Sequence, residues 1–141
     1  MRRMNYGTRL ILVVGALAIA GCAEKGEKVY RTWVGPDRSN MAIVTLQLGP
    51  DVKDVTIRER ELRRSEYGTI QLVPGKYTLH EHDDANIGIT IRPVIMDATK
   101  ARARGELILG HTYVLHAGKS DGKRALWIED ARSGEVFIDT R

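Results

Sequence analysis

The feature that most constrains the fold is a recurring alternation of apolar and polar side chains between residues 42 and 137. Successive side chains of a strand point to opposite faces, so each alternating run predicts a strand with one buried face. Turn residues separate the runs, as Pro74-Gly75 and Ser133-Gly134 do. We therefore predict an all-β chain that folds as a small antiparallel β-sandwich. The runs read MAIVTLQLG, DVTIRER, GTIQLVPGKYTLHEH, NIGITIRPVIM, GELILGHTYVLHAG and RALWIEDARSGEVFIDT.

Local signals add detail to this prediction. Pro-Gly at 74–75 predicts a turn between two strands of a hairpin, Gly110 a strand pair, and Ser133-Gly134 a closing hairpin. Residues 97–106 predict a short helical turn. Residues 58–67, rich in Arg and Glu, fit a strand or a helix, and we interpret them as an exposed strand. The aromatic residues predicted for the core are Tyr77, Tyr113, Trp127 and Phe137.

The first 21 residues have the layout of a secretory signal. A basic segment with Arg2, Arg3 and Arg9 precedes the uncharged run LILVVGALAIA. Crossing the hydrocarbon of a bilayer takes about 20 apolar residues, so this run is too short for a transmembrane helix. We predict that residues 1–21 are removed on export.

The end of that run, Ile19-Ala20-Gly21-Cys22, resembles the lipobox of bacterial lipoproteins. The resemblance implies cleavage between Gly21 and Cys22, with diacylglycerol on the thiol of Cys22 and an acyl chain on its new amino group. Such acyl chains hold a protein at a membrane without spanning it. Residues 22–28 would be the lipidated cysteine and a flexible tether, and residues 29–141 a single β-sandwich domain.

The lipobox also predicts a location. Ala23, rather than Asp, follows the cysteine, which resembles lipoproteins sent to the outer membrane. In a diderm bacterium we expect the periplasmic side of the outer membrane, and in a monoderm one the outer face of the only membrane. Cys22 is the only cysteine, so no disulfide is expected.

The basic overall charge does not indicate nucleic-acid binding. The formal charge is +4, but three of the 22 Lys and Arg residues lie in the leader, which has no acid. The mature chain then has 19 basic against 18 acidic residues, well mixed along the sequence. A nucleic-acid-binding surface needs a basic patch, so we expect no such partner.

Five motifs follow one another along the mature chain: Val34-Gly35-Pro36, Ala42-Ile43-Val44, Leu72 to Tyr77, Gly110-His111-Thr112-Tyr113, and Trp127 to Val136. Their order resembles small bacterial lipoproteins, and the Pro74-Gly75 hairpin resembles that of PEGA-type domains, which are small Ig-like β-sandwiches of binding or envelope proteins. The resemblance implies turn and packing residues but no catalytic ones. The chain departs from the pattern at VTIRERELRRSEYG, where such domains have an Asp-Gly turn.

Two stretches are candidate binding sites. In HEHDD, His80 and His82 would lie on one side of a strand about 7 Å apart, a spacing that one metal ion can bridge. His111 and His116, five residues apart, would face opposite sides and could not both join them. The second stretch is an arginine run that could bind anionic headgroups or an acidic partner, although acids interleave with it. Its members are Arg58, Arg60, Arg63 and Arg64.

Signals for catalysis are weak. None of the serines lies in a Gly-x-Ser-x-Gly motif, and the adjacent Glu129 and Asp130 would face opposite ways on a strand. We therefore expect a non-enzymatic accessory or protein-interaction module, with an envelope protein as partner. We expect no small-molecule substrate and no cofactor beyond the acyl groups on Cys22. A periplasmic metal-binding lipoprotein using His80 and His82 is the alternative, and a hydrolase the third possibility.

Overall fold

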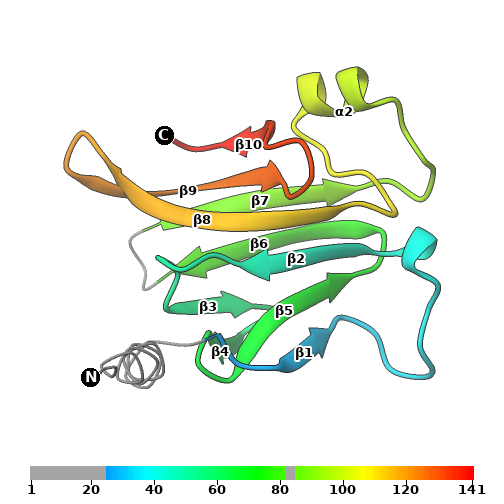
Figure 1. Ribbon diagram of the computed structural model, residues 1–141, viewed down its shortest axis with the longest axis horizontal. Helices are drawn as coiled ribbons and strands as arrows, with labels where there is room; N and C mark the ends of the chain where they lie inside the picture. The colour runs from blue at the N-terminus through cyan, green and yellow to red at the C-terminus, as the bar shows by residue number, and fades with distance from the viewer. Residues whose placement is uncertain (1–24, 82–84) are drawn as a thin grey trace, which may run out of the picture.

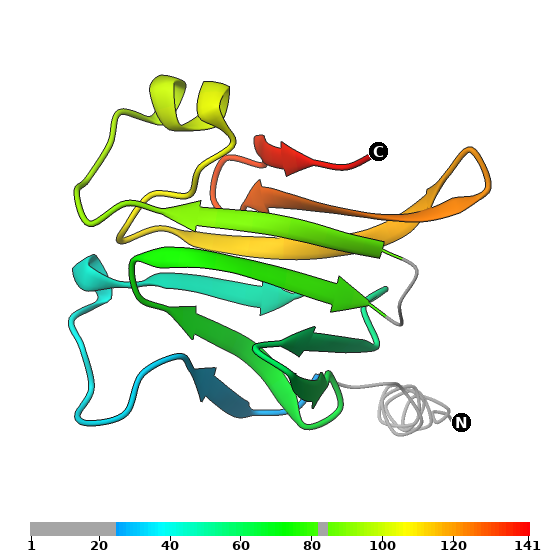
Figure 2. The same cartoon turned by 180° about the vertical axis from the view of Figure 1, so that it is seen from behind.

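The computed structural model describes residues 25–81 and 85–141, and these form two facing sheets (Figure 1, Figure 2). The strand order is β1-β5-β2-β8-β9-β10 in the six-stranded sheet and β4-β3-β6-β7 in the four-stranded sheet. The predicted all-β sandwich is confirmed. The strands are β1 (Lys28–Arg31), β2 (Val44–Leu48), β3 (Asp54–Ile57), β4 (Arg60–Arg63), β5 (Tyr67–Leu72), β6 (Gly75–Glu81), β7 (Ala85–Ile91), β8 (Thr112–Ser120), β9 (Lys123–Asp130) and β10 (Val136–Asp139).

The core lies between the sheets and is filled by the alternating apolar residues of both. On β2, for example, Val44, Leu46 and Leu48 are buried, while Thr45 and Gln47 lie on the outer face. Strands β6 and β7 follow the same pattern from the other sheet. A fully buried Leu or Ile contributes about 1.5–3 kcal/mol relative to an exposed one, so this alternation is the main source of stability.

Most strand pairs are antiparallel, but two pairs in the six-stranded sheet are parallel. β1 runs parallel to β5, and β2 runs parallel to β8, with Thr45 opposite Thr112. Hydrophobic alternation fixes which face of a strand is buried but not which strand lies beside it. The parallel pairs were therefore beyond the reach of the sequence pattern.

The predicted hairpin at Pro74-Gly75 is wrong, because the turn carries the chain from one sheet to the other. β5 ends at Leu72 in the six-stranded sheet, and β6 begins at Gly75 in the four-stranded sheet. Proline has no N–H to donate to a neighbouring strand, so Pro74 favours a break in the sheet at this corner. The Tyr77 hydroxyl fixes this corner by donating to the Val73 carbonyl at 2.7 Å.

Of the two strands predicted around Gly110, only the second one is present. β8 follows Gly110, but residues 106–109 form no strand and make a single parallel bridge, between Leu107 and Ile91. Leu107 to Leu109 are all buried, so this segment closes the end of the core instead of presenting alternate faces. The Ile108 N–H donates to the hydroxyl of Tyr113 at 2.9 Å.

Other local predictions hold. β9 and β10 pair as the closing hairpin. In the ambiguous stretch 58–67, β4 is a strand paired with β3, exposed except for the buried Leu62. Helix α2 (Ala98–Arg104) occupies the predicted helical turn, capped by the Asp97 side chain and ended by Gly105 at φ 68°. A 3₁₀ helix, η1 (Asn40–Ala42), precedes β2.

The loops of the sandwich fall into two groups at its two ends (Figure 1, Figure 2). β1, the first strand described, begins beside the start of β5, toward one end. The loops at residues 32–43, 92–97, 105–111 and 131–135 gather at the opposite end, which we call the distal end. The candidate site described below lies there.

Candidate functional site

The candidate site is built on a contact between His111 and Asp130 at the distal end. His111 immediately precedes β8, and Asp130 is the last residue of β9, opposite Tyr113 in the β8–β9 register. The His111 Nδ1 lies 3.0 Å from the Asp130 Oδ2. The Asp130 side chain is only 8% exposed and the His111 side chain 41% exposed. A buried carboxylate therefore holds an accessible imidazole.

The second oxygen of Asp130 organises the β9–β10 turn. Its Oδ1 accepts hydrogen bonds from the backbone N–H groups of Arg132 at 2.8 Å and Ser133 at 3.0 Å. Burial alone would raise the pKa of Asp130. The hydrogen bonds from His111 and from these two N–H groups outweigh burial, so the pKa of Asp130 lies below its usual value. Asp130 is therefore held ionised.

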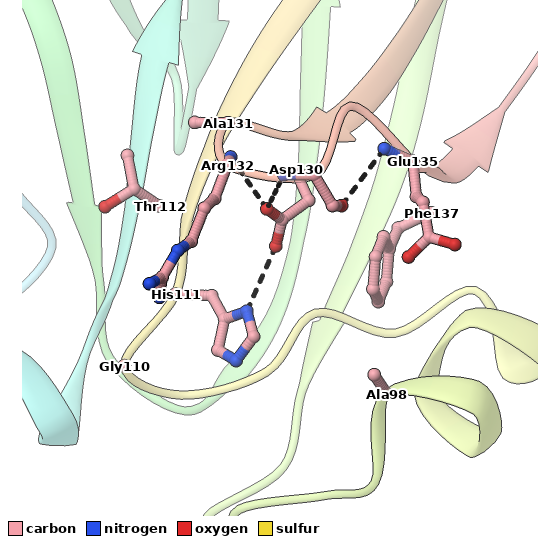
Figure 3. A pocket seen from close by; sticks show the side chains of 10 residues that line it. Ala98, Gly110, His111, Thr112, Asp130, Ala131, Arg132, Glu135 and Phe137 are labelled. Carbon is pink, nitrogen blue, oxygen red and sulfur yellow. Dashed lines mark hydrogen bonds and ion pairs between the residues drawn. The ribbon is translucent and has the colours of Figure 1, made fainter.

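A pocket of about 510 Å³ opens beside this contact (Figure 3). In Figure 3, His111 and Arg132 lie on one side of the Asp130 carboxylate, and Glu135 and Phe137 on the other. The lining residues are Ala98, Gly110, His111, Thr112, Asp130, Ala131, Arg132, Ser133, Glu135 and Phe137.

Stacked rings fix the position of the imidazole. The His111 ring stacks on Tyr113 at a centroid distance of 6.0 Å, and Tyr113 packs edge-on against Phe137 at 5.3 Å. Tyr113 is fully buried, which raises the pKa of its hydroxyl well above the usual range. The phenol therefore stays neutral and acts as a packing surface.

The arrangement leaves one ring nitrogen of His111 able to form a hydrogen bond with a ligand. With Nδ1 of His111 directed at Asp130, the other ring nitrogen, Nε2, is the one available to a ligand. It donates a proton when the ring is charged and offers a lone pair when the ring is neutral and carries its proton on Nδ1. The Ser133 hydroxyl, also in the pocket lining, accepts a hydrogen bond from the Glu135 N–H at 3.2 Å.

A second histidine–carboxylate pair lies on the outer face of the six-stranded sheet. The Nε2 of His116 is 2.6 Å from the Oε1 of Glu129, so Glu129 and Asp130 do face opposite ways. Trp127 is half-buried on this outer face, so its predicted place in the core is wrong. Leu126 and Ile128 take the inward positions instead. The Trp127 ring stacks on His116 at 5.5 Å and under the Arg141 guanidinium at 4.1 Å.

The arginine run does not form one patch. Arg58 lies over the Tyr77 ring at 4.8 Å and donates to the Thr32 carbonyl at 3.0 Å. Arg64 donates to the Leu48 carbonyl at 3.2 Å, which pins a loop to β2.

The other two arginines point elsewhere. Arg60 donates to the Tyr67 hydroxyl at 3.1 Å, and Arg63 is exposed opposite Asp54 on the β3–β4 pair. The interaction surface expected from this run stays a prediction.

The remaining sequence-based sites are only partly in view. His80 is exposed on the outer face of β6, while His82, Gly21 and Cys22 lie outside the described residues. Within residues 25–81 and 85–141, no cluster of three or more His, Cys, Asp or Glu residues could hold a metal ion. Nor does this part of the chain contain a helix long and apolar enough to cross a membrane. The lipid anchor and the His80–His82 metal site stay predictions.

Comparisons with known proteins do not assign this chain to a family. No known protein family matches the chain, no curated protein is detectably similar to it in sequence, and no solved structure is detectably similar to it in fold. The resemblance to PEGA-type lipoproteins therefore stays a prediction, and the functional argument rests on the sequence and the geometry.

Proposed function

We propose that this chain is a membrane-anchored envelope lipoprotein whose β-sandwich acts as a non-enzymatic interaction module. The acyl groups on Cys22 would hold one end of the sandwich near the bilayer, and in a diderm bacterium the bilayer would be the outer membrane. The distal end would then face away from the membrane and meet an envelope protein. This proposal rests on the lipobox-like sequence together with the arrangement of the two ends.

The main support for the proposal is the set of apolar side chains that the distal end exposes. Large apolar side chains in its loops, Val34, Met41, Val94 and Ile95, are each more than half exposed. Met41 lies against Gly110, the residue before His111, so apolar surface borders the pocket. Exposed apolar surface beside a pocket is typical of protein-interaction sites. The chain enters the sandwich at the other end (Figure 1).

The anchor is tested by the intact mass of the protein purified from membranes, with a Cys22→Ala variant beside it. We expect a mass matching residues 22–141 plus acyl groups, and loss of that species in the variant. An unacylated chain in both preparations would overturn the anchor.

The interaction surface is tested by photo-crosslinking in intact cells. A photoreactive residue in place of Val94 should capture an envelope protein. The same residue in place of Thr78, exposed on the outer face of β6, should not. Equal capture from both positions, or from neither, would contradict a role for the distal end.

A further inference from the structure

The pocket beside His111 holds two side chains with hydrogen-bond donors, His111 and Arg132, that a single buried carboxylate positions. The Oδ2 of Asp130 directs the imidazole of His111, and its Oδ1 fixes the backbone from which the Arg132 side chain leaves. The Arg132 side chain lies on the same side of Asp130 as the His111 ring (Figure 3). Two donors held by one anchor in a pocket of about 510 Å³ suggest a two-point ligand site.

The charges around the pocket select the ligand. Both carboxylates that line it are already paired, Asp130 with His111 and Glu135 with Arg102, whose Nη1 lies 3.0 Å away. Within the described residues, no acidic side chain pairs with Arg132. Helix α2, which adds Ala98 to the lining, carries Lys100, Arg102 and Arg104 and no acid. The unmatched charge is therefore positive, and the complementary ligand is an anion.

We propose that this pocket binds a carboxylate of an acidic peptide segment, held between the Arg132 guanidinium and the Nε2–H of His111. Arginine matches the planar carboxylate with two parallel donors. The exposed apolar residues Val94 and Ile95 at the same end suit a peptide better than a small free ion. The inference deepens the proposed function and rests on it, since the segment would belong to the envelope partner.

The contact of His111 Nδ1 with Asp130 leaves Nε2 as the nitrogen that meets the ligand carboxylate. Neutral His111 with its proton on Nδ1 presents a lone pair to the carboxylate, and only the charged ring donates from both nitrogens. The groups facing it are Asp130 from β9, the neutral Tyr113 from β8, Arg132 from the turn, and Glu135 paired with a residue of α2.

The experiment is a titration of the full acylated chain, in nonionic detergent, with a tetraglutamate peptide. Imidazole NMR signals of the four histidines, assigned with His→Gln variants, report the site. We expect the His111 signal to move with tetraglutamate but not with tetraglutamine. Arg132→Gln should weaken binding at least about tenfold, because a charge-assisted pair is lost. Arg104→Gln, which removes the same charge from α2, should change it less than about twofold.

A second anion completes the test. Equal effects of Arg132→Gln and Arg104→Gln would reduce the site to general electrostatics and overturn the proposal. So would inorganic phosphate binding more tightly than the peptide, or a His111 signal that does not move. If tetraglutamate does not bind, capture of a partner from position 94 can still support the proposed interaction surface. If Cys22 carries no acyl groups, the affinity for tetraglutamate should be unchanged.

Discussion

At the scale of single residues, Asp130 joins three parts of the chain through one carboxylate. Asp130 is itself the last residue of β9. Its side chain contacts the imidazole of His111, just before β8, and two backbone N–H groups of the β9–β10 turn. The sequence predicted correctly that Glu129 and Asp130 face opposite ways. It could not predict that His111 is the partner of Asp130, because that depends on the β8–β9 register. The contact between His111 and Asp130 was therefore not predicted from the sequence.

Replacing Asp130 by Asn should destabilise the fold by about 1.5–3 kcal/mol. The amide keeps one acceptor for the turn but loses the charge that binds His111. Urea unfolding measures the loss, with Asp139→Asn as the control. Asp139 pairs with Arg141 at the exposed end of β10, and its loss should cost below about 1 kcal/mol. Similar losses in both variants would contradict a special role for the buried carboxylate.

Acid should remove the same contribution from the wild type. The pKa of Asp130 is lower in the folded than in the unfolded chain. The resulting stability is fully present above about pH 4, the usual carboxyl pKa, and is lost as the pH falls through the folded-state pKa. Thermal unfolding of wild type and Asp130→Asn from pH 7 to pH 2 should therefore converge at the acid end. A gap that stays constant across this range would contradict the assignment.

At the scale of elements, alternation located most strands but not their partners. Every alternating run contains a strand, because burying one face of a strand requires that pattern. The Pro74-Gly75 corner shows the limit, since a turn signal alone does not say whether the next strand joins the same sheet. Trp127 shows another limit. It lies between Leu126 and Ile128 in an apolar run, so the pattern could not decide which of them faces inward.

The turn between β3 and β4 carries an unusual backbone conformation. Arg58 and Glu59 have positive φ angles of 51° and 66°, a region that costs L-residues roughly 1–2 kcal/mol each. Glu59→Gly should stabilise the fold by about 0.5–1 kcal/mol, after the extra flexibility of unfolded glycine is counted. Chemical denaturation provides the measurement.

Arg58→Gly at the neighbouring position is the matched comparison. It relieves the same kind of strain but removes the guanidinium contacts with Tyr77 and Thr32, so it should destabilise. If both glycine variants changed stability in the same direction, the account of this turn would be wrong.

At the scale of the whole molecule, one ion pair ties the two sheets together. Glu81 of β6 is 1% exposed, and both of its oxygens accept from Arg124 of β9, at 3.0 and 2.7 Å. β6 belongs to the four-stranded sheet and β9 to the six-stranded sheet. This ion pair therefore adds a charged contact between the two sheets to their apolar packing.

Breaking that pair on one side should be costly. Arg124→Ala leaves the Glu81 carboxylate buried without its partner, and we expect a loss of about 3–5 kcal/mol in the free energy of unfolding. The double variant Glu81→Met with Arg124→Met should recover most of the loss, because the buried charge is then gone. A double variant as unstable as Arg124→Ala would show that the packing, not the charge, is decisive.

The parallel pairing of β2 with β8 has a consequence for how the protein is made. Thr45 lies beside Thr112 in the middle of the six-stranded sheet, so that sheet cannot close until the last third of the chain has left the ribosome. Pairings this distant slow folding, typically to milliseconds or longer. The six-stranded sheet therefore stays incomplete during most of synthesis, with β2 waiting for its β8 neighbour.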